Sequence, residues 1–236
     1  MATAEGESVM RIEKNFFLCN GFIQPGDLVF DIGVKVGKLT DVFLDAGARV
    51  ICVEPFPNRV AFMREKYGDE ITVLEAAVGA EPGWGVLHYS SRDKLHPTLE
   101  PETYTAQFGK QWLKVYDESM DVVLTTIDEL ITYHGMPAFI KLDVEASEYP
   151  ALCGMTQPVR ALSFEFGMAY AEEAHKCVQR LDSLGYEFNY TQAHKGAFDL
   201  EDWCSGDHFK FILPEQNEDG KWGWGNVYAR LKDAGN

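Results

Sequence analysis

Five acidic residues stand at or just after the ends of short apolar segments, where their side chains could do chemistry: Asp31, Glu54, Asp143, Glu145 and Glu165. The segments are rich in β-branched and aromatic residues, which predicts buried strands. Because the carboxyl ends of parallel strands meet at one edge of a doubly wound sheet, we expect these carboxylates to surround one ligand. Carboxylates in such a crevice can accept hydroxyl hydrogen bonds, hold a cation or take up a proton.

The first segment runs into a glycine turn. Leu28 to Ile32 predicts a strand, and Gly33 and Gly37 allow a tight turn that brings the backbone close to a ligand at the start of the next helix. Glu54 lies 21 positions after Gly33, a spacing at which an acid ending the second strand reaches the two hydroxyls of a ribose. The sequence therefore predicts an adenosine-containing ligand.

Two adenosine cofactors compete for this layout. The dinucleotide fingerprint G-x-G-x-x-G has its middle glycine where Lys35 stands here, and Asp31 lies just ahead of the turn. A carboxylate repels a pyrophosphate but attracts the ammonium and sulfonium groups of S-adenosylmethionine. S-adenosylmethionine is therefore favoured, with a nicotinamide dinucleotide as the alternative.

Strands alternate with helices through most of the chain, which predicts an α/β fold with a mainly parallel sheet covered on both faces. We expect residues 1–236 to form a single domain. The last two strands, expected near His208–Leu213 and Asn226–Ala229, are predicted to form an antiparallel pair at one edge.

Two segments are expected to lie outside this alternation. Residues 1–25 predict an N-terminal helix that covers the sheet. Residues 90–120 are polar and longer than a connector requires, and they contain Tyr104, Trp112 and Tyr116, so they predict a lid or a substrate-side insertion.

Composition excludes several classes of protein. A formal net charge of −16 argues against a nucleic-acid partner, which needs clustered Lys and Arg. We find no apolar run long enough for a membrane span and no signal-peptide pattern, so we expect a cytoplasmic protein with no membrane partner. The 5 cysteines include no C-x-x-C pair, which argues against a zinc site or a disulfide framework.

Several motifs together resemble one family. They are Asp31-Ile32-Gly33 with Gly37, Glu54-Pro55-Phe56-Pro57, Ala76-Ala77-Val78-Gly79, Thr125-Thr126-Ile127-Asp128-Glu129-Leu130 and Ile140-Lys141-Leu142-Asp143-Val144-Glu145-Ala146-Ser147-Glu148. In order and spacing, residues 26–167 resemble the FkbM family of S-adenosylmethionine-dependent methyltransferases. Two positions depart from the family pattern, which usually has Asn at Lys35 and Gly at Ala146.

The resemblance implies a class I (Rossmann-like) three-layer sandwich with a seven-stranded, mainly parallel sheet and an antiparallel edge strand. We assign the following residues to cofactor binding: Asp31, Gly33, Lys35, Gly37, Glu54, Pro55, Ala76, Ala77 and Asp143. Asp143 and Glu145 are the candidate catalytic residues, because a carboxylate within reach can take the proton of an alcohol acceptor. The family does not require a metal; if one is present, its ligands are expected to be Asp143, Glu145 and Glu165.

These residues predict methyl transfer to a hydroxyl group of a small molecule, such as a sugar or a specialised metabolite. A nicotinamide-dependent oxidoreductase is one alternative. The altered positions Lys35 and Ala146 keep open another, a catalytically silent domain that binds an adenosine cofactor or a partner. The 6 histidines show no metal-ligand spacing, and the sequence leaves the oligomeric state open.

Overall fold

The computed structural model describes residues 4–92, 96–103, 116–167, 171–192, 196–210, 212 and 224–232. The helices are α1 (Ala4–Cys19), α2 (Lys38–Asp45), α3 (Pro57–Tyr67), α5 (Ile127–His134), α6 (Glu148–Cys153), α7 (Ala171–Asp182) and α8 (Gly206–Phe209), with a 3-10 turn η1 (Gly68–Glu70). The strands are β1 (Leu28–Ile32), β2 (Arg49–Val53), β3 (Ile71–Leu74), β4 (Ala77–Val78), β5 (Gly83–Tyr89), β6 (Glu118–Thr125), β7 (Phe139–Leu142), β8 (Ala161–Gly167), β9 (Tyr186–Gln192) and β10 (Trp224–Leu231).

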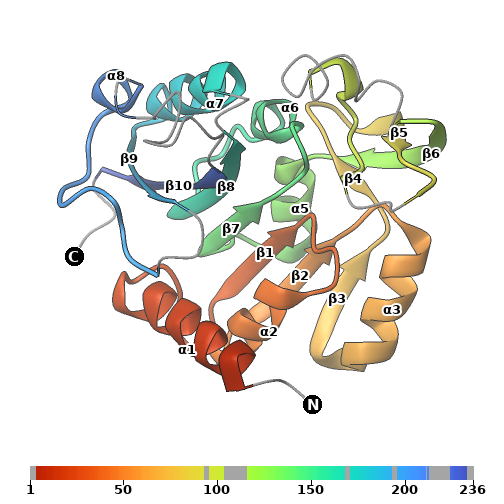
Figure 1. Cartoon of the computed structure of the whole chain (residues 1–236), viewed down its shortest axis with the longest axis horizontal. Helices are drawn as coiled ribbons and strands as arrows, with labels where there is room; N and C mark the ends of the chain where they lie inside the picture. The colour runs from red at the N-terminus through yellow and green to blue at the C-terminus, as the bar shows by residue number, and fades with distance from the viewer. Residues whose placement is uncertain are drawn as a thin grey trace.

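Seven strands form the main sheet in the order β3-β2-β1-β7-β8-β10-β9 (Figure 1). The five strands from β3 to β8 are parallel, whereas β10 is antiparallel to both β8 and β9. The predicted seven-stranded Rossmann-like sheet is confirmed. The antiparallel strand, however, lies one place in from the edge, because β10 returns along β9 and inserts between β9 and β8.

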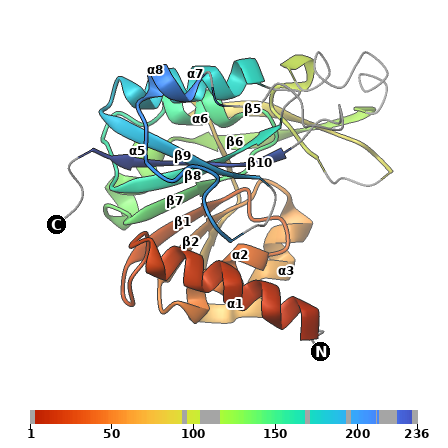
Figure 2. The same ribbon diagram turned by 60° about the vertical axis from the view of Figure 1, so that its left-hand side comes forward.

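Helices cover both faces of this sheet, which gives the three predicted layers (Figure 2). Side chains of α1, α2 and α3 pack in one core with Val29 of β1, and side chains of α5, α6 and α7 pack in the other with Phe30. β1 lies centrally between β2 and β7, and all its residues are buried. Because successive side chains of a strand point to opposite faces, Asp31 points to the α2 side. Because β1 is central in the sheet, the loop that follows it begins at the middle of the edge formed by the carboxyl ends of the strands.

A smaller sheet of β4, β6 and β5 adjoins the main one. β6 begins at Glu118, so the predicted 90–120 insertion ends within a strand. Residues 93–95 and 104–115, with Tyr104 and Trp112, lie outside the described residues, and a lid remains a prediction.

The prediction of a strand at His208–Leu213 is wrong for the residues of this range that the structure describes, because the helix α8 occupies Gly206–Phe209. Phe209 is fully buried and its ring lies 5.5 Å from that of Phe188 on β9. A short apolar segment with one buried aromatic side chain fits a short helix as well as a strand, so the apolar pattern could not distinguish the two.

No helix among the described residues is long and apolar enough to cross a bilayer.

α1 lies within the predicted N-terminal cover of residues 1–25. Phe17 is 3% exposed, and its ring lies 5.4 Å from Phe139 on β7 and 5.1 Å from Phe43 on α2. Phe16 contacts Tyr228 on β10 at 5.1 Å. These edge-to-face pairs join the N-terminal helix to the centre of the sheet.

Phe17→Ala is therefore expected to lower the free energy of unfolding by about 3–5 kcal/mol, through lost burial and the cavity left behind. Phe62→Ala is the matched control, because Phe62 also lies on a helix but is 46% exposed, and it should cost less than about 1 kcal/mol. Urea denaturation measures both. Equal midpoints for Phe17→Ala and wild type would show that α1 is not part of the cooperative unit.

Candidate active site

The carboxyl ends of β1, β2, β7 and β8 lie at one edge of the main sheet (Figure 1), and most of the predicted site residues lie at or just beyond them, with Ala76 and Ala77 following β3. Two neighbouring cavities open there, and both are lined by Gly33, Lys35, Arg59 and Asp143. The first is also lined by Glu54, Pro55, Ala76, Ala77, Pro97 and Leu99. The second has a volume of about 340 Å³ and is also lined by Asp31, Lys38, Lys141, Glu165 and Trp224.

Glu54 ends β2 at the first cavity and is 1% exposed. Its Oε2 accepts a hydrogen bond from the Lys35 backbone N–H at 2.9 Å, and its Oε1 accepts one from the Phe56 N–H at 3.1 Å. Burial nevertheless raises the pKa of Glu54, opposed by Arg59 at 3.4 Å. A carboxylate oxygen has two lone pairs, so Glu54 retains capacity to accept ribose hydroxyls.

The first cavity is small, at about 40 Å³, which is room for a few water molecules. Ala76 and Ala77 keep its floor open because they carry only methyl groups. Pro97 and Leu99, from the segment 96–103, also line it. The cavity in this structure is therefore smaller than a nucleoside.

Gly33 places two loops in direct contact. Its φ is +80°, and a Cβ there would lie 1.8 Å from the Asp143 carbonyl oxygen, so only glycine fits. The loops after β1 and β7 are thereby held together. Gly37, also predicted to bind cofactor, lines neither cavity. Its carbonyl accepts a hydrogen bond from the Tyr67 hydroxyl at 2.8 Å, which shapes the start of α2.

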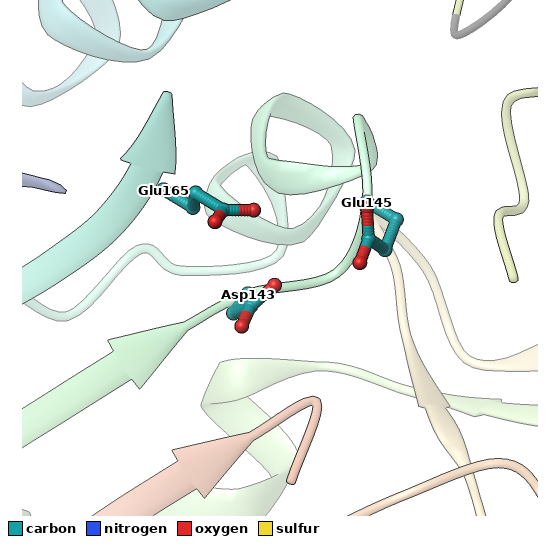
Figure 3. A group of neighbouring side chains, drawn as sticks. All are labelled: Asp143, Glu145 and Glu165. Carbon is teal, nitrogen blue, oxygen red and sulfur yellow. The ribbon is translucent and has the colours of Figure 1, made fainter. Parts of the chain in front are cut away.

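Asp143, Glu145 and Glu165 come together as expected (Figure 3), with one oxygen of each within 4.8 Å of the others. The Lys35 ammonium group joins them, with its Nζ 2.6 Å from Glu145 and 3.3 Å from Asp143. Burial disfavours the charge of Lys35, but Asp143 and Glu145 outweigh it and raise the pKa of Lys35. Lys35 therefore contacts carboxylates through its side chain and Glu54 through its backbone.

Lys141 is a site residue that the sequence reasoning missed. It is 6% exposed on β7, and its Nζ lies 3.2 Å from Asp143, 3.7 Å from Asp31 and 3.2 Å from the Gly33 carbonyl. Although burial acts to raise the pKa of Asp143, Lys141 and Lys35 hold it below its usual value. A single Lys within the apolar run Phe139–Leu142 was the available signal, because such a residue needs a buried partner.

Asp31 is deeper than predicted. It is 1% exposed, and its Oδ2 accepts a hydrogen bond from the Thr40 hydroxyl at 2.6 Å. Burial raises the pKa of Asp31. Within the described part of the chain, no hydrogen bond reaches its Oδ1, although Asp31 lines the second cavity. The Oδ1 instead lies 3.7 Å from the Lys141 Nζ, so the charge of Asp31 is balanced within the chain.

His96 was also missed, because its partner is 49 residues away in the sequence. The Nδ1 of His96 lies 3.0 Å from the same Glu145 oxygen that contacts Lys35. Carboxylate–imidazole pairs of this kind set the tautomer of a histidine and support proton transfer. Glu145 therefore connects the segment 96–103 to the loop after β1.

Glu165 gives the site a pH dependence. Burial, and then the charges of Asp143 and Glu145, raise the pKa of Glu165 to about 9. The folded protein keeps a proton that the unfolded chain loses above about pH 4.3, so the free energy of unfolding falls as pH rises through about 5–9. Glu148, whose pKa burial raises to about 8, acts in the same direction.

Glu165→Gln should flatten the loss of stability between about pH 6 and 9, because glutamine has no proton to release. Denaturant midpoints at several pH values measure the slope. Glu81→Gln, at an exposed turn, is the control and should keep the wild-type slope. An unchanged slope in Glu165→Gln would mean that Glu165 is already ionised at neutral pH.

Comparisons with known proteins agree with this fold. A ribosomal RNA small subunit methyltransferase A of Anaeromyxobacter sp. (strain K) is 43% identical over 53 residues, which are 22% of this chain and 19% of that protein. The match thus spans about a fifth of that relative's length. Precorrin-6y C5,15-methyltransferase of Geobacter metallireducens superposes with a TM-score of 0.50 and 9% identity, covering 96% of this chain and 87% of that one. At this identity the likeness supports the fold alone.

The family is identified by a longer match. The family model described as the methyltransferase FkbM domain matches residues 31–188, which include both loops and every predicted site residue. S-adenosylmethionine is the cofactor of this family, and the chain offers suitable groups for it: Glu54 for ribose hydroxyls and Gly33 for close backbone approach. The chain belongs to the FkbM methyltransferase family.

Proposed function

We propose that this protein transfers a methyl group from S-adenosylmethionine to a hydroxyl group of a small molecule, such as a sugar or a specialised metabolite. When bound, the cofactor supplies a methyl group carried on a positively charged sulfur. The observation that carries the proposal is the contact of Gly33 with the Asp143 carbonyl. It sets a cluster of carboxylates against the end of the cofactor cleft, where an acceptor oxygen would need alignment and a proton acceptor.

In this proposal the adenosine end of the cofactor lies in the first cavity, at Glu54, Pro55, Ala76 and Ala77. The acceptor enters the second cavity, which is lined by both charged and apolar residues. Val36 and Trp224 line that cavity too and are 50% and 43% exposed. An acceptor with polar groups at one end and an apolar or ring-shaped body matches this lining.

The two candidate catalytic carboxylates receive different roles. Asp143 lies between Lys35 and Lys141, which keep it ionised, so it is a hydrogen-bond acceptor that aligns the hydroxyl rather than a strong base. Glu145, which lines the first cavity beside Asp143 and pairs with His96 and Lys35, is the group that we assign to proton removal. This division follows from the number of ammonium neighbours: Asp143 has two, Lys35 and Lys141, whereas Glu145 has one, Lys35.

The choice of a small molecule over nucleic acid follows from the net charge of −16. Such a chain repels a phosphate backbone unless lysine and arginine side chains gather on one face. The two alternative functions use other contacts. A nicotinamide dinucleotide would have to place its pyrophosphate close to the Asp31 carboxylate, which would repel it. In a catalytically silent domain, the Glu145–His96 pair would have no role in proton transfer.

Glu54→Ala should weaken S-adenosylmethionine binding by about ten- to a hundredfold, because charge-assisted hydroxyl contacts contribute roughly 1.5–3 kcal/mol. Titration calorimetry measures this effect. Glu75→Ala is the matched control, since Glu75 follows β3 as Glu54 follows β2 but is exposed. Equal affinities for the two variants would remove Glu54 from the cofactor site.

Glu145→Gln should reduce turnover by about 10²–10⁴, while S-adenosylmethionine affinity stays within about threefold, because a proton acceptor acts in the chemical step. The assay follows labelled methyl groups into a panel of hydroxylated small molecules, with RNA and protein as separate arms. Glu118→Gln, an exposed change on β6, serves as control. Label that appears only on RNA or protein would contradict the proposed acceptor class.

A further inference from the structure

The carboxylates at the acceptor side of the cleft already have a cation from the chain itself. The Lys35 Nζ lies 2.6 Å from Glu145 and 3.3 Å from Asp143. Glu165 lies beside them, with an oxygen within 4.8 Å of an oxygen of each. Three carboxylates this close would otherwise repel one another or bind a metal ion.

A divalent cation and the lysine ammonium compete for this place. Magnesium and calcium bind carboxylate oxygens at about 2.0–2.6 Å, and the Lys35 ammonium lies 2.6 Å from the Oε1 of Glu145. Glu145 is 5% exposed, and the same oxygen contacts His96. A metal ion on this oxygen would be repelled by the ammonium, because like charges this close repel strongly in a buried site.

We propose that Lys35 takes the place of a divalent cation at this site. The inference rests on the proposed methyl transfer. Lys35 acts as a positioning residue: its ammonium holds Asp143 and Glu145 in the orientation that the acceptor requires, as a metal ion would.

The backbone supports this role. Lys35 has a φ of +55°, and Glu145 and Ala146 have φ values of 54° and 69°, although none of the three is glycine. Left-handed backbone costs a non-glycine residue about 1–2 kcal/mol. Two of these three residues, Lys35 and Glu145, have the side chains that form the 2.6 Å ion pair. Strain concentrated at one contact indicates that the contact has a function.

The first test is metal binding without cofactor or acceptor, measured with Mn²⁺ by electron paramagnetic resonance. Lys35→Met keeps the side-chain length and removes the charge, so it should bind Mn²⁺ at least about tenfold more tightly than wild type. Lys35→Arg keeps the charge and should bind as weakly as wild type. Lys66→Met removes a lysine that pairs with Asp41, and it controls for the change in net charge.

The second test is turnover with labelled S-adenosylmethionine. Wild type should be unaffected by EDTA, and Lys35→Met should lose about tenfold or more of its activity and regain part of it with Mg²⁺ or Mn²⁺. Lys35→Arg should retain activity without metal. Loss of wild-type activity in EDTA with recovery in Mg²⁺ would overturn the inference.

Two further outcomes separate this inference from the proposed function. Wild-type protein that binds Mn²⁺ as tightly as Lys35→Met would overturn the role of Lys35, and the wild-type measurement does not depend on whether the variant folds. If no acceptor in the panel is methylated, the proposed function fails. The Mn²⁺ comparison still decides whether Lys35 excludes a metal.

Discussion

The site depends on charge compensation between the ends of β1 and β7. Asp31 and Lys141 are paired neighbours in the register of these strands, both almost fully buried, and Lys141 reaches forward to Asp143. An unpaired charge at this depth costs several kcal/mol, so each group requires the others. The loops after both strands must therefore stay close together, and Gly33, with no side chain, allows their backbones to touch. This constraint places a cofactor cleft and a polar cluster at the same edge of the sheet.

Lys35 extends the same principle outward. Its backbone N–H binds Glu54 at the end of β2, and its side chain reaches Asp143 and Glu145 beyond β7. One residue thus contacts both halves of the cleft. This arrangement explains how the chain tolerates a left-handed lysine at this position, since two ion pairs and a backbone hydrogen bond offset the strain.

The carboxylates of the site differ in protonation because their surroundings differ. Lysine neighbours keep Asp143 ionised, whereas Glu165 lies near other carboxylates and keeps its proton at neutral pH. Similar side chains can therefore align a hydroxyl, accept its proton or donate a hydrogen bond within a few ångströms of one another. The fold brings the strand ends together, and the local charges determine which carboxylate is ionised and which is protonated.

The sequence alone determined the family, the central strands and the carboxylates of the site, because these depend on local spacing: an apolar run, a glycine turn and an acid at the end of each strand. It did not determine the contacts of Lys141 and His96, the insertion of β10 between β8 and β9, or the helix at Gly206–Phe209. It also left open whether Asp143, Glu145 and Glu165 hold a metal, since the answer depends on where the Lys35 ammonium lies. That position is set by residues up to 110 places apart in the sequence. No local pattern encodes such a contact, and only the packed strands and their loops decide it.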